Sequence, residues 1–132
     1  MKTDFTALSS LIAELYPNYS QIRDGVINIG LDSFILTIAK IPGVEDTVLL
    51  RTRVLSLNEV KRSGEFALAA ASGNFFWGGA RGAELSVGPD NALYLTEQRL
   101  IDDLGSKDAL DDCISDFTLS VSDWKIRSLN YA

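Results

Sequence analysis

The residues that most often carry out chemistry in proteins are scarce in this chain. It contains no histidine and only one cysteine, Cys113. Without histidine it lacks the commonest general base and the commonest metal ligand. One thiolate cannot supply the roughly four nitrogen or sulfur ligands of a structural zinc site. We therefore expect no catalytic residue, no cofactor and no metal, and we expect Cys113 to be a buried structural thiol beside an apolar helix stripe.

Neighbouring carboxylates are the remaining candidates for acid–base chemistry. They occur as the pairs Glu45-Asp46, Asp102-Asp103 and Asp111-Asp112. Side chains that are adjacent along a helix point in different directions, so these pairs do not converge on one substrate atom. Folding could still bring distant carboxylates together, as glycosidases require. A carboxylate-based enzyme is therefore kept as the least favoured of three hypotheses.

A glycine-rich segment, residues 73–82 (GNFFWGGARG), invites comparison with a phosphate-binding loop. It lacks the terminal Lys-Ser/Thr pair, and it follows a predicted helix instead of opening one. Its glycines are better explained as a sharp turn from helix to strand. Its three consecutive aromatic residues either fill the core or form part of an interface, where aromatic residues are enriched.

The composition indicates a soluble globular domain that does not bind nucleic acid. The 132 residues carry a formal net charge of −6, with a pI of about 4.5. The 12 basic residues are scattered, whereas nucleic-acid binding needs them clustered. Seven aspartates lie between Asp102 and Asp123; they either form a solvated helix face or attract a basic partner.

The same composition predicts one cytoplasmic domain that spans residues 1–132. This length suits a single domain. No apolar run approaches the ~18 residues that cross a bilayer, so we expect no membrane insertion. The N-terminus has no separate apolar region or cleavage site of the kind that a secretory signal peptide contains.

The periodicity of apolar residues places these features on an α+β framework. Residues 5–15 form an amphipathic helix whose stripe is Phe5, Leu8, Ile12, Leu15 and Tyr19. Residues 26–31, 34–40 and 47–57 alternate as three strands, and the short turns between them favour an antiparallel meander.

The second half of the chain is again predicted to form a helix followed by strands, and it ends with a third helix. Residues 64–76 form an alanine-rich helix, and residues 83–87 and 93–96 form a hairpin. The last helix covers residues 107–129, with the stripe Leu110, Ile114, Phe117, Val121 and Trp124. The predicted fold is α-β-β-β-α-β-β-α, a twisted antiparallel sheet with helices packed on one face.

This order of elements resembles the class I type III secretion chaperones of the CesT (Tir chaperone) family over nearly the whole chain. Residues 29–32 (IGLD) running into 34–37 (FILT), and residues 48–51 (VLLR), carry part of the resemblance. The most telling stretch is 65–71 (EFALAAA) followed by 74–79 (NFFWGG). These patterns are loose, but the small size and acidity also fit the family.

The resemblance implies a homodimer with the second helix near its two-fold axis. It also implies that the protein binds the N-terminal segment of a secreted effector in the bacterial cytoplasm. Binding would keep that segment non-globular and export-competent without ATP. A small peptide-binding adaptor outside secretion is the alternative, because sequence alone does not separate the two.

Two sets of residues are the candidates for these contacts. The expected dimer interface, on the second helix and just after it, is Phe66, Ala67, Ala70, Ala71, Phe75, Phe76 and Trp77. The expected effector contacts are Leu8, Ile12, Leu31, Phe34, Leu36, Ile38, Leu93 and Leu95. The alanines could instead pack on their own sheet, and half or more of the effector candidates are expected to be core. The pattern does not tell which face of the sheet is open.

Overall fold

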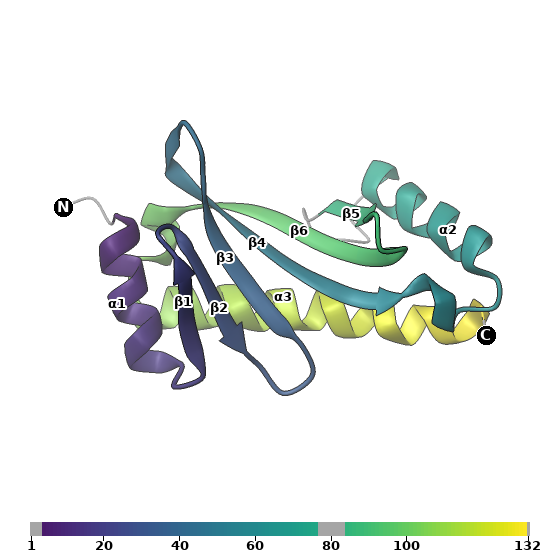
Figure 1. Cartoon of the computed structure of the whole chain (residues 1–132), viewed down its shortest axis with the longest axis horizontal. Coiled ribbons are helices and arrows are strands. Elements are labelled where there is room, and N and C mark those ends of the chain that lie inside the picture. The colour runs from purple at the N-terminus through teal and green to yellow at the C-terminus, as the bar shows by residue number, and fades with distance from the viewer. Residues whose placement is uncertain (1–3, 77–83, 132) are drawn as a thin grey trace. The chain divides into compact units, whose positions relative to one another are not determined.

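The structure, a computed structural model, describes residues 4–76 and 84–131, and for residues 71–76 it describes the backbone alone (Figure 1). Three α-helices, six strands and three short 3-10 helices follow one another in this part of the chain. The helices are α1 (Phe5–Leu15), α2 (Ser63–Phe76) and α3 (Lys107–Ser128). The strands are β1 (Tyr19–Arg23), β2 (Val26–Gly30), β3 (Ile35–Ile41), β4 (Val44–Ser56), β5 (Glu84–Val87) and β6 (Ala92–Leu100). The 3-10 helices are η1 (Leu57–Glu59), η2 (Ile101–Leu104) and η3 (Leu129–Tyr131).

The strands form one sheet in the order β1-β2-β3-β4-β6-β5. The pairings β1–β2, β2–β3, β3–β4 and β5–β6 are all antiparallel. The α+β class and the antiparallel sheet are therefore confirmed, and the helix and strand bounds fall close to the predicted ones. Of the predicted glycine-rich segment, residues 73–76 end α2, and the turn expected after them lies outside the described residues.

Strand β1 corrects the prediction, which had five strands where the structure has six. Asp24 and Gly25 form the turn that folds β1 back on β2, and Gly25 adopts a φ of 78°. Glycine reaches this left-handed conformation without the steric cost of a side chain, which is why Asp-Gly marks tight hairpins. Tyr19, predicted to end the apolar stripe of the first helix, lies in β1 instead.

Helix α1 begins and ends where the sequence predicts. The backbone N–H of Ala7 donates to the Asp4 carboxylate at 2.8 Å, so Asp4 is the N-cap. The helix ends at Leu15, two residues before Pro17, which disfavours helical geometry at the residue before it. Phe5, Leu8 and Ile12 are buried, as the stripe requires.

The contacts of the chain group into two compact units. The first consists of the chain up to Arg51 together with Gln98–Ser115, and the second consists of Thr52–Glu97 together with the chain from Asp116 onward. Elements β4, β6 and α3 contribute residues to both. Because each unit draws on both halves of the sequence, neither is a contiguous domain, and the single domain over 1–132 stays a prediction.

The first unit has its core on one face of strands β2, β3 and β4. This face consists of fully buried residues: Ile27, Ile29, Leu36, Ile38, Val48 and Leu50. Helix α1 adds Leu8 and Ile12, and the start of α3 adds Leu110 and Ile114. Two polar contacts tie α1 to α3: Tyr16 Oη donates to Asp111 Oδ1 at 3.0 Å, and Lys107 Nζ lies 2.6 Å from Glu14 Oε1.

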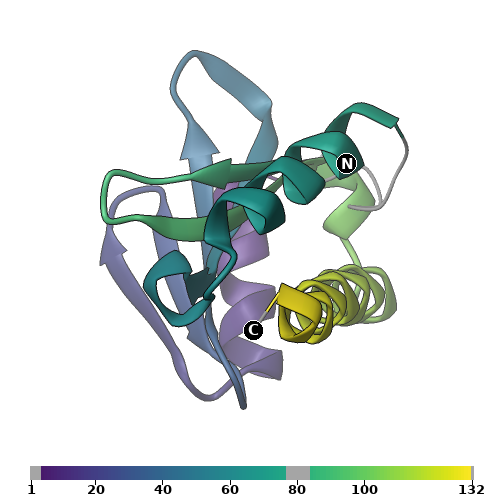
Figure 2. The same cartoon turned by 90° about the vertical axis from the view of Figure 1, so that its right-hand side faces the viewer.

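The second unit has its core around Phe66 of α2. The Phe66 ring centroid lies 6.2 Å from that of Trp124 in an edge-to-face arrangement, and 5.3 Å from that of Tyr131. Leu93 and Leu95 of β6 are buried here, as are Phe117, Val121 and Trp124 of α3. All five residues of the predicted α3 stripe are therefore buried in one unit or the other. Figure 2 looks along α3 from its C-terminal end.

Candidate functional site

The face of β2, β3 and β4 opposite the first core is the candidate site. Successive side chains of a strand point to opposite faces, so the residues between the buried ones lie on this second face. One row across the sheet joins Val26, Ala39 and Leu49, and the next joins Asn28, Thr37 and Arg51. Each residue of the first row is half-buried, so no other element among the described residues fully covers it. We name this surface the open face.

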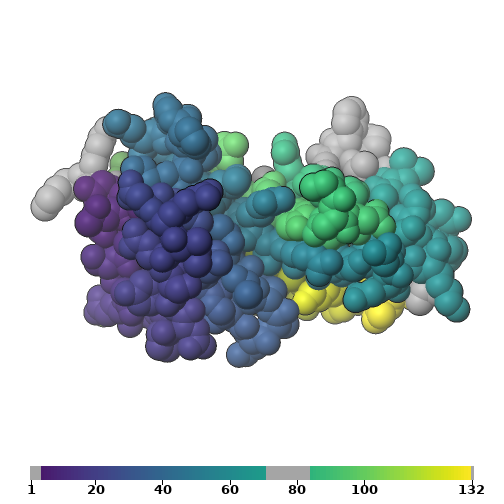
Figure 3. Space-filling model, viewed as in Figure 1, coloured from purple at the N-terminus to yellow at the C-terminus, as the bar shows by residue number. Residues whose placement is uncertain are grey.

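The margins of the open face carry both charged and apolar residues: exposed Arg23 pairs with Val26, and exposed Arg51 ends the second row. Ile35, next to Gly30 across the β2–β3 pairing, is 61% exposed, and Ile22 on the edge strand β1 is also exposed. Between these isoleucines, Thr37 Oγ1 donates to Asn28 Oδ1 at 2.8 Å. The hydrogen bond satisfies two polar groups that a partner would otherwise have to desolvate. Figure 3 shows the surface over β1, β2 and β3 facing the viewer.

The structure places most of the expected effector contacts in the core. Seven of the eight are buried: Leu8, Ile12, Phe34, Leu36, Ile38, Leu93 and Leu95. Leu31 is half-buried. Within a single chain the buried seven therefore serve packing, and their contact with an effector stays a prediction. The open face consists of their strand neighbours, which sequence reasoning missed because both faces of these strands carry apolar residues.

The expected dimer residues divide in a similar way. Phe66 and Ala70 are buried within the second unit, and Ala67 is half-buried. The side chains of Ala71, Phe75 and Phe76, and the whole of Trp77, lie outside what the structure describes. The exposed side of α2 instead carries Leu68, which is 70% exposed. The spacing could have shown this, because Leu68 lies about 200° around the helix from Phe66.

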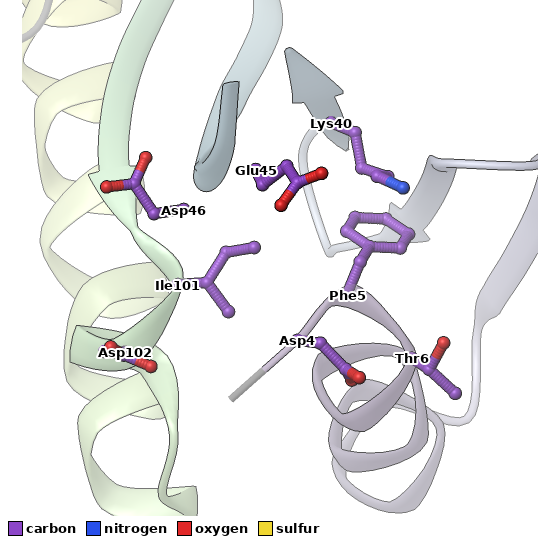
Figure 4. A pocket seen from close by; sticks show the side chains of 8 residues that line it. All are labelled: Asp4, Phe5, Thr6, Lys40, Glu45, Asp46, Ile101 and Asp102. Atoms are coloured by element: carbon purple, nitrogen blue, oxygen red, sulfur yellow. The ribbon is translucent and has the colours of Figure 1, made fainter. Parts of the chain in front are cut away.

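A hollow of about 370 Å³ at the start of α1 is where a carboxylate-based reaction would be sought (Figure 4). Asp4, Glu45, Asp46 and Asp102 stand around it, and all four are exposed residues. Its apolar side is formed by Phe5 and Ile101. Acid–base catalysis depends on two groups whose environments differ strongly, typically through burial of one of them. The charged residues around this hollow, the four carboxylates and Lys40, are all exposed.

The remaining chemical candidates are structural. Cys113 is buried, as predicted. Among residues 4–70 and 84–131, no group of three or more acidic or sulfur-containing side chains is arranged to hold a metal ion. Burial and the nearby Asp111 carboxylate raise the pKa of Tyr16 to about 12, because both disfavour the phenolate. The hydrogen bond from Tyr94, at 2.7 Å, lowers the pKa of Asp90 because it stabilises the carboxylate.

Comparison with known proteins shows which of them share this fold. No protein-family model and no curated protein matches the sequence. Among solved structures, the Yersinia pestis type III secretion chaperone SycH, in complex with a fragment of YscM2, matches 96% of this chain and 98% of its own, with a TM-score of 0.60 at 15% identity. A chain of the HopA1-SchA chaperone-effector complex matches 90% of this chain and 90% of its own, with a TM-score of 0.63 at 16% identity. The chain has the fold of type III secretion chaperones.

A protein without an assigned function has a similar fold. An uncharacterized protein from Methanothermobacter thermautotrophicus matches 96% of this chain and 98% of its own, with a TM-score of 0.68 at 12% identity. One fold can host unrelated functions, so function has to be argued from surfaces. Among the described residues, no helix is both long and apolar enough to cross a membrane.

Proposed function

We propose that this protein is a type III secretion chaperone of the CesT kind. It acts as a homodimer in the bacterial cytoplasm, binds the N-terminal segment of a secreted effector and keeps that segment non-globular without ATP. The observation that supports this most is the open face, a sheet surface with a half-buried apolar row at its centre, on a fold shared with chaperones in chaperone–effector complexes. The protein works by binding and has no catalytic step.

The open face suits an unfolded guest chain. Its central row of Val26, Ala39 and Leu49 crosses three strands, which stand about 4.8 Å apart. A guest segment can bury apolar side chains on this row and, on the far side of the polar row, on Ile35. In the polar row next to it, Thr37 and Asn28 are bonded to each other, so covering these two oxygens need not break a hydrogen bond to the protein. The same surface would serve an adaptor outside secretion, so the identity of the bound client decides between the two.

Energetics favours two subunits over one. Ordering about 50 guest residues costs on the order of 50 kcal/mol of backbone entropy at about 1 kcal/mol per residue. Apolar burial at about 25 cal/mol per Å² offsets this only over roughly 2,000 Å². Two open faces supply more of that area than one. We therefore keep the homodimer, with α2 as its interface and Leu68 as its exposed apolar anchor.

Arginine at Leu68 tests the dimer more cleanly than arginine at Ala70, which would disrupt the core that buries Ala70. Leu68→Arg places charge on an exposed helix face and should give a monomer in light scattering across a dilution series. Leu100→Arg is the matched control, because Leu100 is also exposed but lies on β6 in the first unit. A dimer that persists in Leu68→Arg would exclude Leu68 from the interface.

Client binding is tested by affinity purification from the source bacterium followed by mass spectrometry. The N-terminal segment of the protein recovered is then titrated calorimetrically in the absence of nucleotide. Ile35→Asp should weaken binding at least tenfold, because it places a charge on the open face. Ile126→Asp, on α3, is the control with the same exposed fraction of 61%. A client that binds both variants equally, or that needs ATP, would contradict the proposal.

A further inference from the structure

The short helix η3 closes over part of the core of the second unit. Phe66 of α2 has no exposed surface, and its ring packs against the rings of Trp124 and Tyr131. Trp124 belongs to α3, whereas Tyr131 ends η3. All three residues lie in the second unit. Tyr131 is therefore the part of η3 that covers the Phe66 ring.

This core contains a polar group that the fold leaves unsatisfied. Trp124 is 1% exposed, and among the described residues its buried indole Nε1–H finds no hydrogen-bond acceptor. Buried tryptophans usually do place this N–H on an acceptor. A buried donor without one has given up its hydrogen bond to water and gained none in return, which costs free energy. An arrangement that lets water reach the indole would remove this cost.

One residue, Arg62, ties η3 to α2. It directly precedes α2, whose start lies beside the C-terminal end of α3 (Figure 1). Its backbone N–H donates to the Tyr131 carbonyl at 3.0 Å, and its guanidinium donates to the Asn130 carbonyl. The same guanidinium lies 5.4 Å from the centre of the Tyr131 ring and 3.3 Å from Glu65 Oε2. We name the contacts of Arg62 with Asn130 and Tyr131 the latch.

The latch is made of contacts that water can reach. The side chain of Arg62 is 53% exposed, and none of the residues Leu129–Tyr131 is buried. Hydrogen bonds and ion pairs at exposed positions add little to stability. Segments with few buried apolar contacts and solvent-exposed hydrogen bonds are the ones that open locally in native proteins while the core stays closed. On these criteria η3 is among the first parts of the second unit to open.

We propose that η3 is a latched cover, which opens while the rest of the second unit stays folded and thereby exposes Phe66 and Trp124. In the closed form the latch keeps both rings in the core. In the open form Tyr131 leaves Phe66, and water reaches the indole N–H of Trp124. The open form offers Phe66 to a partner, which is the role that the sequence pattern assigned to it. The motion lies within one subunit and is independent of the proposed client binding.

Hydrogen–deuterium exchange of the Trp124 indole N–H, followed by NMR, measures this opening. Trp77→Phe removes the other tryptophan of the chain and so assigns the signal. The backbone amide of Val121, about one turn earlier in α3, reports unfolding of the helix. Local opening exposes little surface, so the indole rate should hardly change at low urea concentration, whereas the Val121 rate should rise with urea.

Three variants separate the latch from general stability. Arg62→Ala breaks the latch and should accelerate indole exchange about fivefold, the factor that one lost hydrogen bond typically represents. Asp4→Ala removes the N-cap of α1 in the other unit, so it should lower global stability by a similar factor but leave the indole rate unchanged. Lys61→Ala removes an exposed positive charge next to the latch and should also leave the indole rate unchanged.

Three results would overturn the proposal. The first is a urea dependence of the indole rate equal to that of the Val121 amide, which would mean that only unfolding exposes Trp124. The second is equal acceleration of indole exchange by Asp4→Ala and Arg62→Ala, which would point to the same conclusion. The third is an indole rate in Arg62→Ala equal to that of the wild type, which would exclude Arg62 as the latch. No client takes part in these measurements, so a failure of the proposed function would leave them unaffected.

Discussion

Replacing Phe66 with alanine separates a core role for this residue from a role at the dimer interface. Phe66 has no exposed surface and packs its ring against Trp124 and Tyr131. Truncating a buried phenylalanine to alanine costs about 3–5 kcal/mol, which includes the cavity left behind. Domains of this size have a total stability of only about 5–15 kcal/mol. We therefore expect Phe66→Ala to remove about a fifth or more of the free energy of unfolding.

Urea unfolding measures this loss. Proteins of this size have denaturant slopes of about 1–3 kcal/mol per molar urea, so the midpoint should fall by roughly 1.5–2.5 M at a slope of ~2. Tryptophan fluorescence, to which Trp124 contributes, and far-UV circular dichroism should both follow it. Leu68→Ala is the control, because truncating a side chain that is 70% exposed should change stability by no more than about 0.5 kcal/mol.

Two outcomes would refute the core assignment. A midpoint that falls by less than about 0.5 M would mean that Phe66 is not packed as the structure shows. A loss that depends on protein concentration would mean that Phe66 stabilises the chain through a second subunit, since dimer stability follows mass action. In that case Phe66 would belong to the interface, as the sequence pattern first suggested.

Three further substitutions test local contacts. Asp4→Ala should lower the free energy of unfolding by about 1 kcal/mol, because it removes the N-cap of α1, whereas Asp4→Asn should lose little; thermal melting compares them. Tyr16→Phe should make the stability of the protein fall less steeply as the pH rises above 10. The pKa of Tyr16 is about 12 in the folded protein and 10.0 in the unfolded chain. The contribution of the protonated Tyr16 to the free energy of unfolding is therefore complete below pH 10 and is lost as the pH rises toward 12. Unfolding midpoints over that range should then fall less steeply in the variant, and equal slopes would contradict the Asp111 contact. Arg62→Ala should cost about 1 kcal/mol in urea unfolding, since the Arg62 guanidinium bonds the Asn130 carbonyl, and Arg62→Lys should recover only part of it.

The elements of this fold could be predicted from local signals because those signals agree with the tertiary structure. Asp4 and Pro17 bound α1, and Pro42-Gly43 joins β3 to β4 in a tight hairpin with Gly43 at a φ of 80°. Helix α3 follows its buried stripe over its whole length. Where periodicity, caps and turns point the same way, single-sequence reasoning is reliable.

The predictions that differ from the structure concern exposure. Strand β1 has no buried residue, so it shows no alternation between apolar and polar positions, and only Asp24-Gly25 signalled it. The open face could not be predicted from the sequence for another reason. Val26 and Ile27, or Leu49 and Leu50, are adjacent apolar residues on opposite faces, and only the packing of α1 and α3 decides which face is covered. Strand pattern alone carries no information about that choice.

The irregularity in β1 has a consequence for the behaviour of the protein in a crowded cell. β1 ends the sheet, so its outer backbone groups could template the addition of foreign strands, the first step toward fibres. Its pairing with β2 slips between Gln21 and Arg23, which bends and twists the strand where an incoming chain would need a flat ladder. This bend therefore opposes the addition of foreign strands to the exposed edge of the sheet.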